Sequence, residues 1–524
     1  MKLKVIIISL WAFICLLMAC YEDKGNYDLV DYNQIEKMAL VSSLSKSSII
    51  LGDTLKLVMD FTWKYPDRDT SDAAFEFVWK QTWSGDTISR ERNLIYVPDE
   101  CGTFNYYLFV TEKATGVVSR YSANVTIKSP YMVGWIIGSM KDGKPAINYI
   151  RRDSWKDDDN KTHYFWSDFP DLYSDLQPGS PLPNANLLSV TAYTMDNTED
   201  EVVVIQEGGY ATVLNGDNLG KVLELRDEFQ GAAYPTGFEP MAFCRGGYCD
   251  FAIGLNGNIY WRRNQNSSAM HHEAYFMDIP VYFPGGGSKI SKVFDVSTNK
   301  SNCILLHDEL NNRLVGCYTS YSSGNSYLGA KLDIINTNDP NTFMDLLNLG
   351  DNKLIYCGDH TDGKNFVTIV KNASTGEYIY QSFILNGNYE TRTIIDATQE
   401  VFAGNSLVSD NTVYWRLRLS GYLYFGEGSK LYFYDVNTKV VKEYTDFGNG
   451  ARITHIMQDA DCTRVGVALN DGRFYICDAI NPEILGAAHP GETGILHRVH
   501  GLGDIKSVSW KWGGYYNLVF DRYQ

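Results

Sequence analysis

One hairpin-like pattern recurs along the C-terminal three-quarters of the chain. In each unit a run of β-branched and aromatic residues leads into a turn of Gly, Asp or Asn, and a second run with Tyr, Phe or Trp follows. Seven such units over about 390 residues give a period of about 55 residues, which is typical of a β-propeller with small four-stranded blades. The units lie at 134–150, 201–214, 250–263, 302–318, 353–370, 421–444 and 464–479.

The pattern predicts seven blades, and its irregular spacing leaves six or eight open. Neither WD nor kelch signatures occur, and a second set of β-sandwiches is the alternative architecture. The C-terminal stretch GGYYNLVF, at 513–520, is expected to add a strand to the first blade and so close the ring. We therefore predict an all-β protein whose propeller spans residues 129–524.

Residues 37–128 show a different arrangement of short strands. Leu55, Leu57, Met59 and Phe61 occupy alternate positions, with polar Lys56 and Asp60 among the residues between them, so the four are expected to share one buried face. The sequence EKATG, at 112–116, is expected to form a hairpin loop, with its glycine at a position of positive φ. About 90 residues of this kind predict a small β-sandwich.

The N-terminus predicts a secretory signal peptide at residues 1–19. Two lysines occur among the first four residues, and an apolar run from Val5 to Ala19 follows. As a helix this run would rise about 22 Å, which is short of the roughly 30 Å of a bilayer core. The sequence LMAC at 17–20 resembles the bacterial lipobox, in which a lipidated cysteine becomes the first residue of the mature protein. We expect acyl chains on Cys20 to hold the protein on a membrane, with an ordinary signal peptide as the alternative.

The charge of the expected mature chain excludes some partners. The full sequence has 46 Lys and Arg against 63 Asp and Glu, and removing Lys2 and Lys4 changes the net charge from −17 to −19. Such an acidic chain has no basic footprint for nucleic acid or anionic lipid. Residues 20–36 lack a clear period and are rich in acids, Asn and Gly, so we expect a lipidated tether there.

Three segments of the predicted sandwich resemble a PKD-type immunoglobulin-like domain: FEFVWKQ at 75–81, CGTFNYYLFV at 101–110 and SRYSANVTI at 119–127. Together with the lipobox and the sequence CYEDKGNYD that begins at Cys20, they resemble the PKD-like family lipoproteins of Bacteroidetes. Members of that family are encoded beside TonB-dependent importers of the SusC/SusD type. The acidic YED after Cys20 resembles the signal that sends such lipoproteins to the outer face of the outer membrane.

The resemblance implies a non-catalytic, cell-surface lipoprotein of the outer membrane. It would be an accessory ligand-binding or docking component of a nutrient importer, with oligopeptides or glycans as ligands. One alternative is a propeller hydrolase or lyase that acts on a peptide or polysaccharide. Another is a purely structural subunit of the importer.

No catalytic motif is present in the sequence. There is no phosphate-binding loop, nucleophile elbow or H-E-x-x-H helix, although a triad assembled by folding stays open. We expect no cofactor. The oxygen-rich runs at 157–160 and 359–365 leave Ca²⁺ as an alternative, although neither matches the full EF-hand loop. Cys244 and Cys249 flank a plausible hairpin turn and are the best candidates for a disulfide.

Aromatic residues in turn-rich sequence are the candidate ligand-binding residues. Six of them occur at 154–173, which we interpret as one long loop inserted after the first repeat, with local packing against a blade as the alternative. These six are Trp155, Tyr164, Phe165, Trp166, Phe169 and Tyr173. Trp510 and Trp512, near the C-terminus, are further candidates, with packing inside a blade as the alternative.

The lipid anchor can be tested at its cysteine. Cys20→Ser removes the thiol that would carry the lipid, so this variant is expected to leave the membrane fraction and to incorporate no radiolabelled palmitate. Cys15→Ser, inside the apolar run, is the matched control and should remain labelled. Label retained by the Cys20 variant would contradict the assignment.

Overall fold

The computed structural model describes residues 32–193, 201–229, 234–245, 249–263, 275–283, 287–294, 303–322, 326–334, 336–337, 343–359, 365–387, 392–418, 420–448, 450–459, 462–480, 482 and 494–512. The chain is an all-β protein and divides into two compact units, residues 1–128 and 129–524. Within the described ranges, no helix has the length and apolar character needed to cross a membrane.

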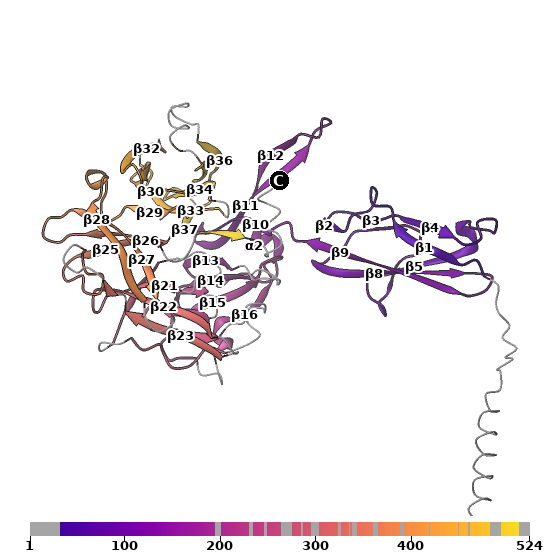
Figure 1. The fold of residues 1–524 in the computed structure, drawn as a ribbon, viewed down its shortest axis with the longest axis horizontal. Helices are drawn as coiled ribbons and strands as arrows, with labels where there is room; N and C mark the ends of the chain where they lie inside the picture. Colours follow the sequence, from indigo (N-terminus) through magenta and orange to yellow (C-terminus); the bar gives the residue numbers. More distant parts are fainter. Residues whose placement is uncertain are drawn as a thin grey trace, which may run out of the picture. The chain divides into compact units, whose positions relative to one another are not determined.

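The N-terminal unit is a β-sandwich (Figure 1). Its larger sheet has the order β2 (Ser48–Ile50), β9 (Val118–Lys128), β8 (Gly102–Glu112), β5 (Phe75–Lys80) and β6 (Thr87–Ser89). The other layer pairs β1 (Ile35–Leu40) with β4 (Met59–Trp63) and β3 (Leu55–Leu57) with β7 (Leu94–Tyr96). A short 3-10 helix, η1 (Asp72–Ala74), precedes β5.

The predicted alternation in this unit is confirmed. Leu55, Leu57, Met59 and Phe61 are all buried, and they pack in one core cluster around Trp79. The indole nitrogen of Trp79 donates to the carbonyl of Glu91 at 3.1 Å, so the buried ring leaves no unpaired donor.

The C-terminal unit is a β-propeller, and its described residues form seven sheets, numbered here in chain order. The first sheet has the order β12 (Thr162–Phe169), β11 (Lys144–Lys156), β10 (Val133–Lys141) and β37 (Asp504–Trp512). The second has the order β13 (Leu187–Tyr193), β14 (Glu201–Gln206), β15 (Tyr210–Asn215) and β16 (Lys221–Glu224). The third has the order β17 (Pro240–Arg245), β18 (Cys249–Gly254) and β19 (Ile259–Arg263). The fourth is β20 (Ile290–Phe294), β21 (Cys303–Asp308), β22 (Arg313–Ser322) and β23 (Ser326–Ile334).

The fifth sheet has the order β24 (Asn336–Thr337), β28 (Arg392–Val401), β27 (Tyr378–Gly387), β26 (Asn365–Lys371) and β25 (Lys353–Asp359). The last two are β29 (Val413–Arg416), β30 (Tyr422–Glu427), β31 (Lys430–Asp435) and β32 (Val440–Asp446), and then β33 (Ile453–Gln458), β34 (Arg464–Leu469), β35 (Phe474–Asp478) and β36 (Ile495–Val499). The short helices α2 (Leu172–Leu176), η2 (Leu225–Glu228) and η4 (Asn405–Leu407) lie in connections.

The repeat read from the sequence is confirmed as neighbouring strands of these sheets. Each predicted hairpin contains at least two neighbouring strands of one sheet, namely β10 and β11, β14 and β15, β18 and β19, β21 and β22, β25 and β26, β30 and β31, and β34 and β35. The number of blades stays a prediction. A second regularity was not visible in the sequence: in six of the seven sheets one edge strand or its equivalent, namely β37, β13, β17, β20, β25 or β33, carries one extra residue opposite its neighbour. Such a bulge bends and twists a strand. The extra residues are Leu188, Met241, Ser291, Ile355, Thr454 and Lys506.

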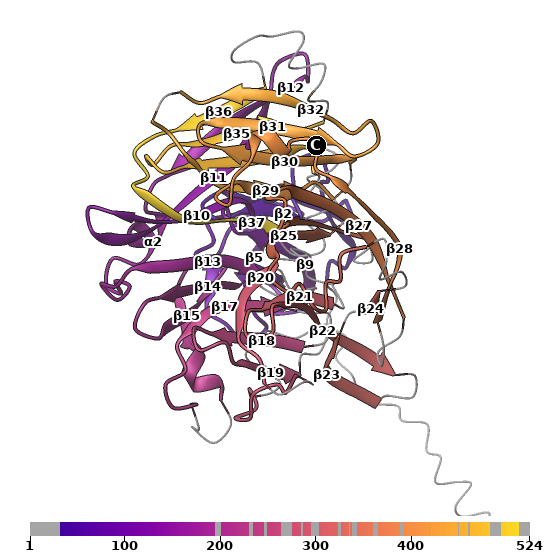
Figure 2. The same cartoon turned by 90° about the vertical axis from the view of Figure 1, so that its left-hand side faces the viewer.

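The two ends of the propeller meet in the first sheet. β37, near the C-terminus, pairs antiparallel with β10 from Val133 opposite Trp512 to Met140 opposite Asp504, and the two strands lie side by side in both views (Figures 1 and 2). The expected closing strand at 513–520 lies outside the described residues. The closing strand in the structure is β37, which precedes it in the sequence.

Close approach of neighbouring sheets depends on glycine. A Cβ atom added at Gly426 in β30 would lie 2.6 Å from Cγ2 of Ile453 in β33, the first strand of the next sheet. Because Ile453 is buried, it has little room to move.

Gly426→Ala is therefore expected to destabilise the propeller by about 1–3 kcal/mol through overpacking. Gly179→Ala is the matched control, because a Cβ atom there meets nothing within 4 Å, and its effect should stay within about 0.5 kcal/mol. Urea unfolding of both variants measures the difference. Equal stabilities would show that the sheets are not in tight contact at Gly426.

Candidate functional site

A two-stranded hairpin extends beyond the first sheet of the propeller. β10 pairs with β11 only as far as Ile150, whereas β11 and β12 continue to pair up to Lys156 opposite Thr162. Residues 151–169, which we name the aromatic arm, project from the rest of the C-terminal unit (Figure 1). The expectation of a long loop at 154–173 was wrong: its residues form this hairpin and then α2.

The acidic run at 157–160 forms the turn of the arm. The carboxylate of Asp157 accepts the backbone N–H groups of Asp159 at 3.1 Å and Lys161 at 2.8 Å, and Asn160 has a φ of 62°. Asp157 also lies 2.6 Å from Nε2 of His163, and these hydrogen bonds lower the pKa of its carboxyl group. Across the ranges that the structure describes, no three His, Cys, Asp or Glu residues are grouped to hold a metal ion. The second candidate Ca²⁺ run, at 359–365, lies mostly outside those ranges.

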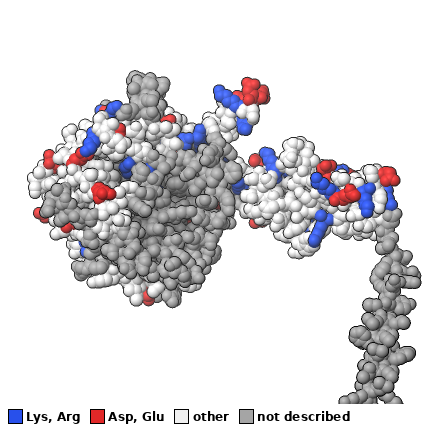
Figure 3. All heavy atoms as spheres, viewed as in Figure 1, with Lys and Arg blue, Asp and Glu red and all other residues white. Residues whose placement is uncertain are grey.

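Three aromatic rings on the arm are open to solvent. The register places Trp155 and Phe165 on one face, with exposed fractions of 54% and 46%, and Tyr164 on the other face, with 43%. Trp155 stacks on His163 with ring centres 4.6 Å apart, and the Arg152 guanidinium lies 3.6 Å from the Tyr164 ring centre. These contacts restrict the rings while leaving their outer surfaces uncovered. Figure 3 shows basic side chains along the arm and acidic ones at its tip.

The base of the arm is attached to the last sheet. Trp166 stacks on His497 of β36 with ring centres 5.6 Å apart, and Nε2 of His497 lies 2.7 Å from the carboxylate of Asp168. Phe169, the last of the arm residues, is half-buried and packs edge-on against Tyr131. The base of the arm is therefore held by contacts with His497 and Tyr131, and the tip extends beyond these contacts.

The remaining sequence candidates fall into two groups. Tyr173 and Trp510 are each 4% exposed and pack in core clusters, so neither ring is available to a ligand. The hydroxyl of Tyr173 donates to the carbonyl of Ser180 at 2.5 Å, and Trp510 packs edge-on against Trp135 at 4.9 Å. The second group lies outside the described residues: it contains Cys20 and the side chains of Trp512 and Cys249. The disulfide between Cys244 and Cys249 stays a prediction, with the two residues on the paired strands β17 and β18.

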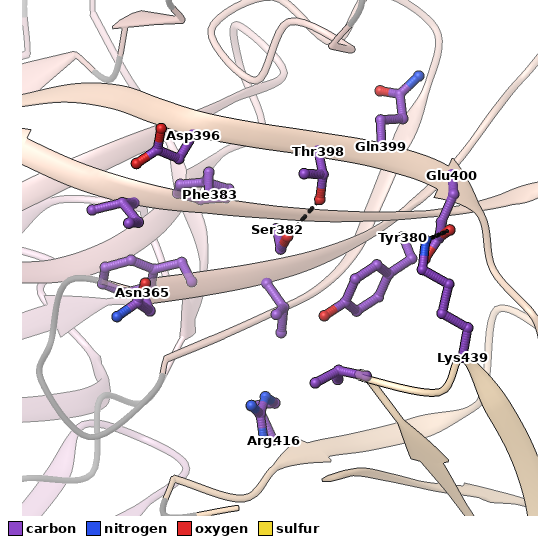
Figure 4. Close-up of a pocket in the computed structure, with 14 residues that line it drawn as sticks. Asn365, Tyr380, Ser382, Phe383, Asp396, Thr398, Gln399, Glu400, Arg416 and Lys439 are labelled. Atoms are coloured by element: carbon purple, nitrogen blue, oxygen red, sulfur yellow. Dashed lines mark hydrogen bonds and ion pairs between the residues drawn. The ribbon is translucent and has the colours of Figure 1, made fainter. Parts of the chain in front are cut away.

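A cleft between the fifth and sixth sheets was not found from the sequence. It has a volume of about 540 Å³, and its walls come from β26, β27, β28, β29 and the turn between β31 and β32 (Figure 4). The lining residues are Asn365, Phe366, Val367, Tyr380, Ser382, Phe383, Ile384, Asp396, Thr398, Gln399, Glu400, Arg416, Val436 and Lys439.

Ion pairs and hydrogen bonds hold the polar walls of this cleft. Glu400 accepts from Lys439 Nζ at 2.5 Å and from the Tyr434 hydroxyl at 3.1 Å. Nη1 of Arg416 donates to three backbone carbonyls, including those of Leu417 at 2.6 Å and Tyr422 at 2.9 Å. Burial, helped by the negative charge of Glu400, raises the pKa of Tyr380 to about 12 although Arg416 acts against it, so its hydroxyl keeps its proton at neutral pH.

Residues 20–180 match the family model described as the PKD-like family. This match confirms the resemblance to the PKD-like family for residues 20–180, and the lipoprotein character stays a prediction. The comparison with curated proteins finds no match.

Several solved structures are similar to the chain at low identity. A quinonprotein alcohol dehydrogenase-like protein from Bacteroides thetaiotaomicron has 12% identity and a TM-score of 0.35, with 92% of this chain and 99% of that chain covered. The β-propeller domain of Cps50 (Swd1) from Myceliophteria thermophila has 9% identity and a TM-score of 0.36, with 60% and 89% covered. At these values neither structure indicates what this chain binds or catalyses.

The exposed rings of the arm are expected to be dispensable for folding. Trp155→Ala and Phe165→Ala should each change the free energy of unfolding by no more than about 0.5 kcal/mol, since both side chains lie at the surface. Trp510→Ala should cost about 3–5 kcal/mol, because it leaves a cavity in the core. Chemical unfolding checks this contrast. A large loss of stability in the two arm variants would mean that their rings have a packing role instead.

Proposed function

We propose that this chain is a non-catalytic lipoprotein of the outer membrane that serves a TonB-dependent importer of the SusC/SusD type as a docking or ligand-binding component. The observation that carries the proposal is the aromatic arm, which presents Trp155, Tyr164 and Phe165 to solvent on a projecting hairpin. In this proposal the arm contacts a protein of the importer, while Cys20 and the tether hold the chain at the same membrane.

Physical chemistry supports docking by the arm. Large exposed apolar side chains on a folded surface mark interaction sites, and aromatic residues dominate the energy of many protein interfaces. A ring with few rotatable bonds loses little entropy when it is covered, and here the stacking on His163 and the Arg152 contact reduce that loss further. The charged side chains around the rings would form the polar rim of such an interface.

The His and Asp pairs of the arm favour a positioning role over catalysis. The pair of Asp168 and His497 joins the arm to β36, and the pair of Asp157 and His163 closes the turn. A catalytic His would hold a nucleophile, but the hydroxyl of Ser167, the serine nearest in sequence to Asp168, donates to the carboxylate of Asp153 at 2.5 Å.

Co-purification tests the proposal on the complete lipidated protein. A tagged copy is isolated from outer membranes in mild detergent, and its partners are identified by mass spectrometry. We expect importer subunits in the eluate, and at least a tenfold smaller yield with the triple variant Trp155→Ala, Tyr164→Ala, Phe165→Ala.

The control variant removes three exposed tyrosines elsewhere on the propeller. Tyr210→Ala, Tyr275→Ala and Tyr282→Ala together should leave the yield of importer unchanged, because these residues lie outside the arm. Absence of importer subunits with the unmodified protein would refute the proposal, and equal yields from the two triple variants would refute the role of the arm.

A further inference from the structure

The cleft between the fifth and sixth sheets is a second candidate site, separate in sequence and sheet from the arm. A volume of about 540 Å³ is within the range of about 300–1,000 Å³ that small-ligand sites occupy. Figure 4 shows Tyr380, Ser382, Asp396, Thr398 and Arg416 around the same space. No residue of the arm lines it.

The charges of the cleft balance. Arg416 and Lys439 supply two positive charges, and Asp396 and Glu400 supply two negative charges, so the sum is zero. One of the two pairs is already formed, since Lys439 contacts Glu400 at 2.5 Å. A neutral ligand therefore fits the cleft better than a strongly charged one, which would meet a like charge on one side.

The polar groups of the walls suit hydroxyl groups. The carboxylate of Asp396 accepts hydrogen bonds, and the protonated Tyr380 hydroxyl donates one. Ser382 and Thr398, whose hydroxyl oxygens lie 2.6 Å apart, add groups that both donate and accept. A saccharide presents many hydroxyl groups with the same double capacity, and the apolar side chains of Val367, Ile384 and Val436 offer contacts to the C–H groups of its ring.

The structure gives less support to an extended peptide as the ligand of this cleft. A peptide commonly binds by adding a strand to a free sheet edge. β28 lies towards the edge of the fifth sheet, but β24 already pairs with it, with Asn336 opposite Thr393 and Thr337 opposite Ile394. That part of the edge is occupied by the chain itself.

We propose that this cleft binds a neutral saccharide unit, with Tyr380 and Asp396 as the residues that recognise its hydroxyl groups. The inference rests on the ligand-binding role in the proposed function and names the class of ligand, whereas the docking role rests on the aromatic arm. Loss of one can therefore be observed without loss of the other.

Two conservative variants test the cleft. Tyr380→Phe removes only the hydroxyl group. Asp396→Asn replaces one carboxylate oxygen, and Asn tolerates the positive φ of 50° at this position. Tyr210→Phe, at an exposed tyrosine of β15, is the matched control.

The measurement is calorimetric titration of the full chain with a panel of neutral hexose oligosaccharides, with thermal melting as the check on folding. We expect at least one oligosaccharide to bind and each cleft variant to weaken its affinity about tenfold. The Tyr210 control and the triple variant of the arm should bind it like the unmodified chain.

Three results would overturn the inference: no neutral oligosaccharide binds, only charged ones bind, or folded cleft variants bind as well as the control. In each case, continued co-purification with the importer would leave the docking role in place. Cleavage of a bound oligosaccharide would support the ligand class but would refute the non-catalytic role proposed above.

Discussion

The pairing of β37 with β10 is the interaction on which the propeller depends. It joins residues from the two ends of the C-terminal unit in one sheet, so the ring closes through backbone hydrogen bonds. Trp135 and Trp510 pack edge-on across this pair, and both are buried. β37 also contacts the next sheet, because the hydroxyl of Ser507 accepts the N–H of Val190 at 2.8 Å. Loss of β37 would expose the edge of β10 and uncover this part of the core.

The same sheet carries the aromatic arm, and this gives the arm a fixed base. β10, β11 and β12 follow β37 in order, so the strands that continue into the arm begin at the closure of the ring. The pair of Asp168 and His497 adds a connection to the seventh sheet. The turn of the arm joins β11 to β12.

Local pattern predicted the strands well, because alternation and turn residues act over a few positions. The buried face of Leu55, Leu57, Met59 and Phe61 and the repeated hairpins are examples. The arm was interpreted as a loop, since its aromatic and charged residues are exposed on both faces and show no apolar face. Trp510 was predicted to bind a ligand, but it is buried against Trp135, which lies 375 positions away in the sequence. The residues around Trp510 in the sequence do not indicate this distant contact. The cleft was missed for a related reason: its lining residues come from several strands and a turn, and they form no motif.

Photo-crosslinking in intact outer membranes tests the central claim, that the arm contacts an importer. A benzophenone amino acid replaces Phe165 on the arm in one variant and Tyr210 on β15 in another, since both side chains are exposed. After irradiation, the account predicts a covalent adduct between position 165 and an importer subunit, with none from position 210. Adducts from both positions, or none from position 165 when the importer is present, would contradict it.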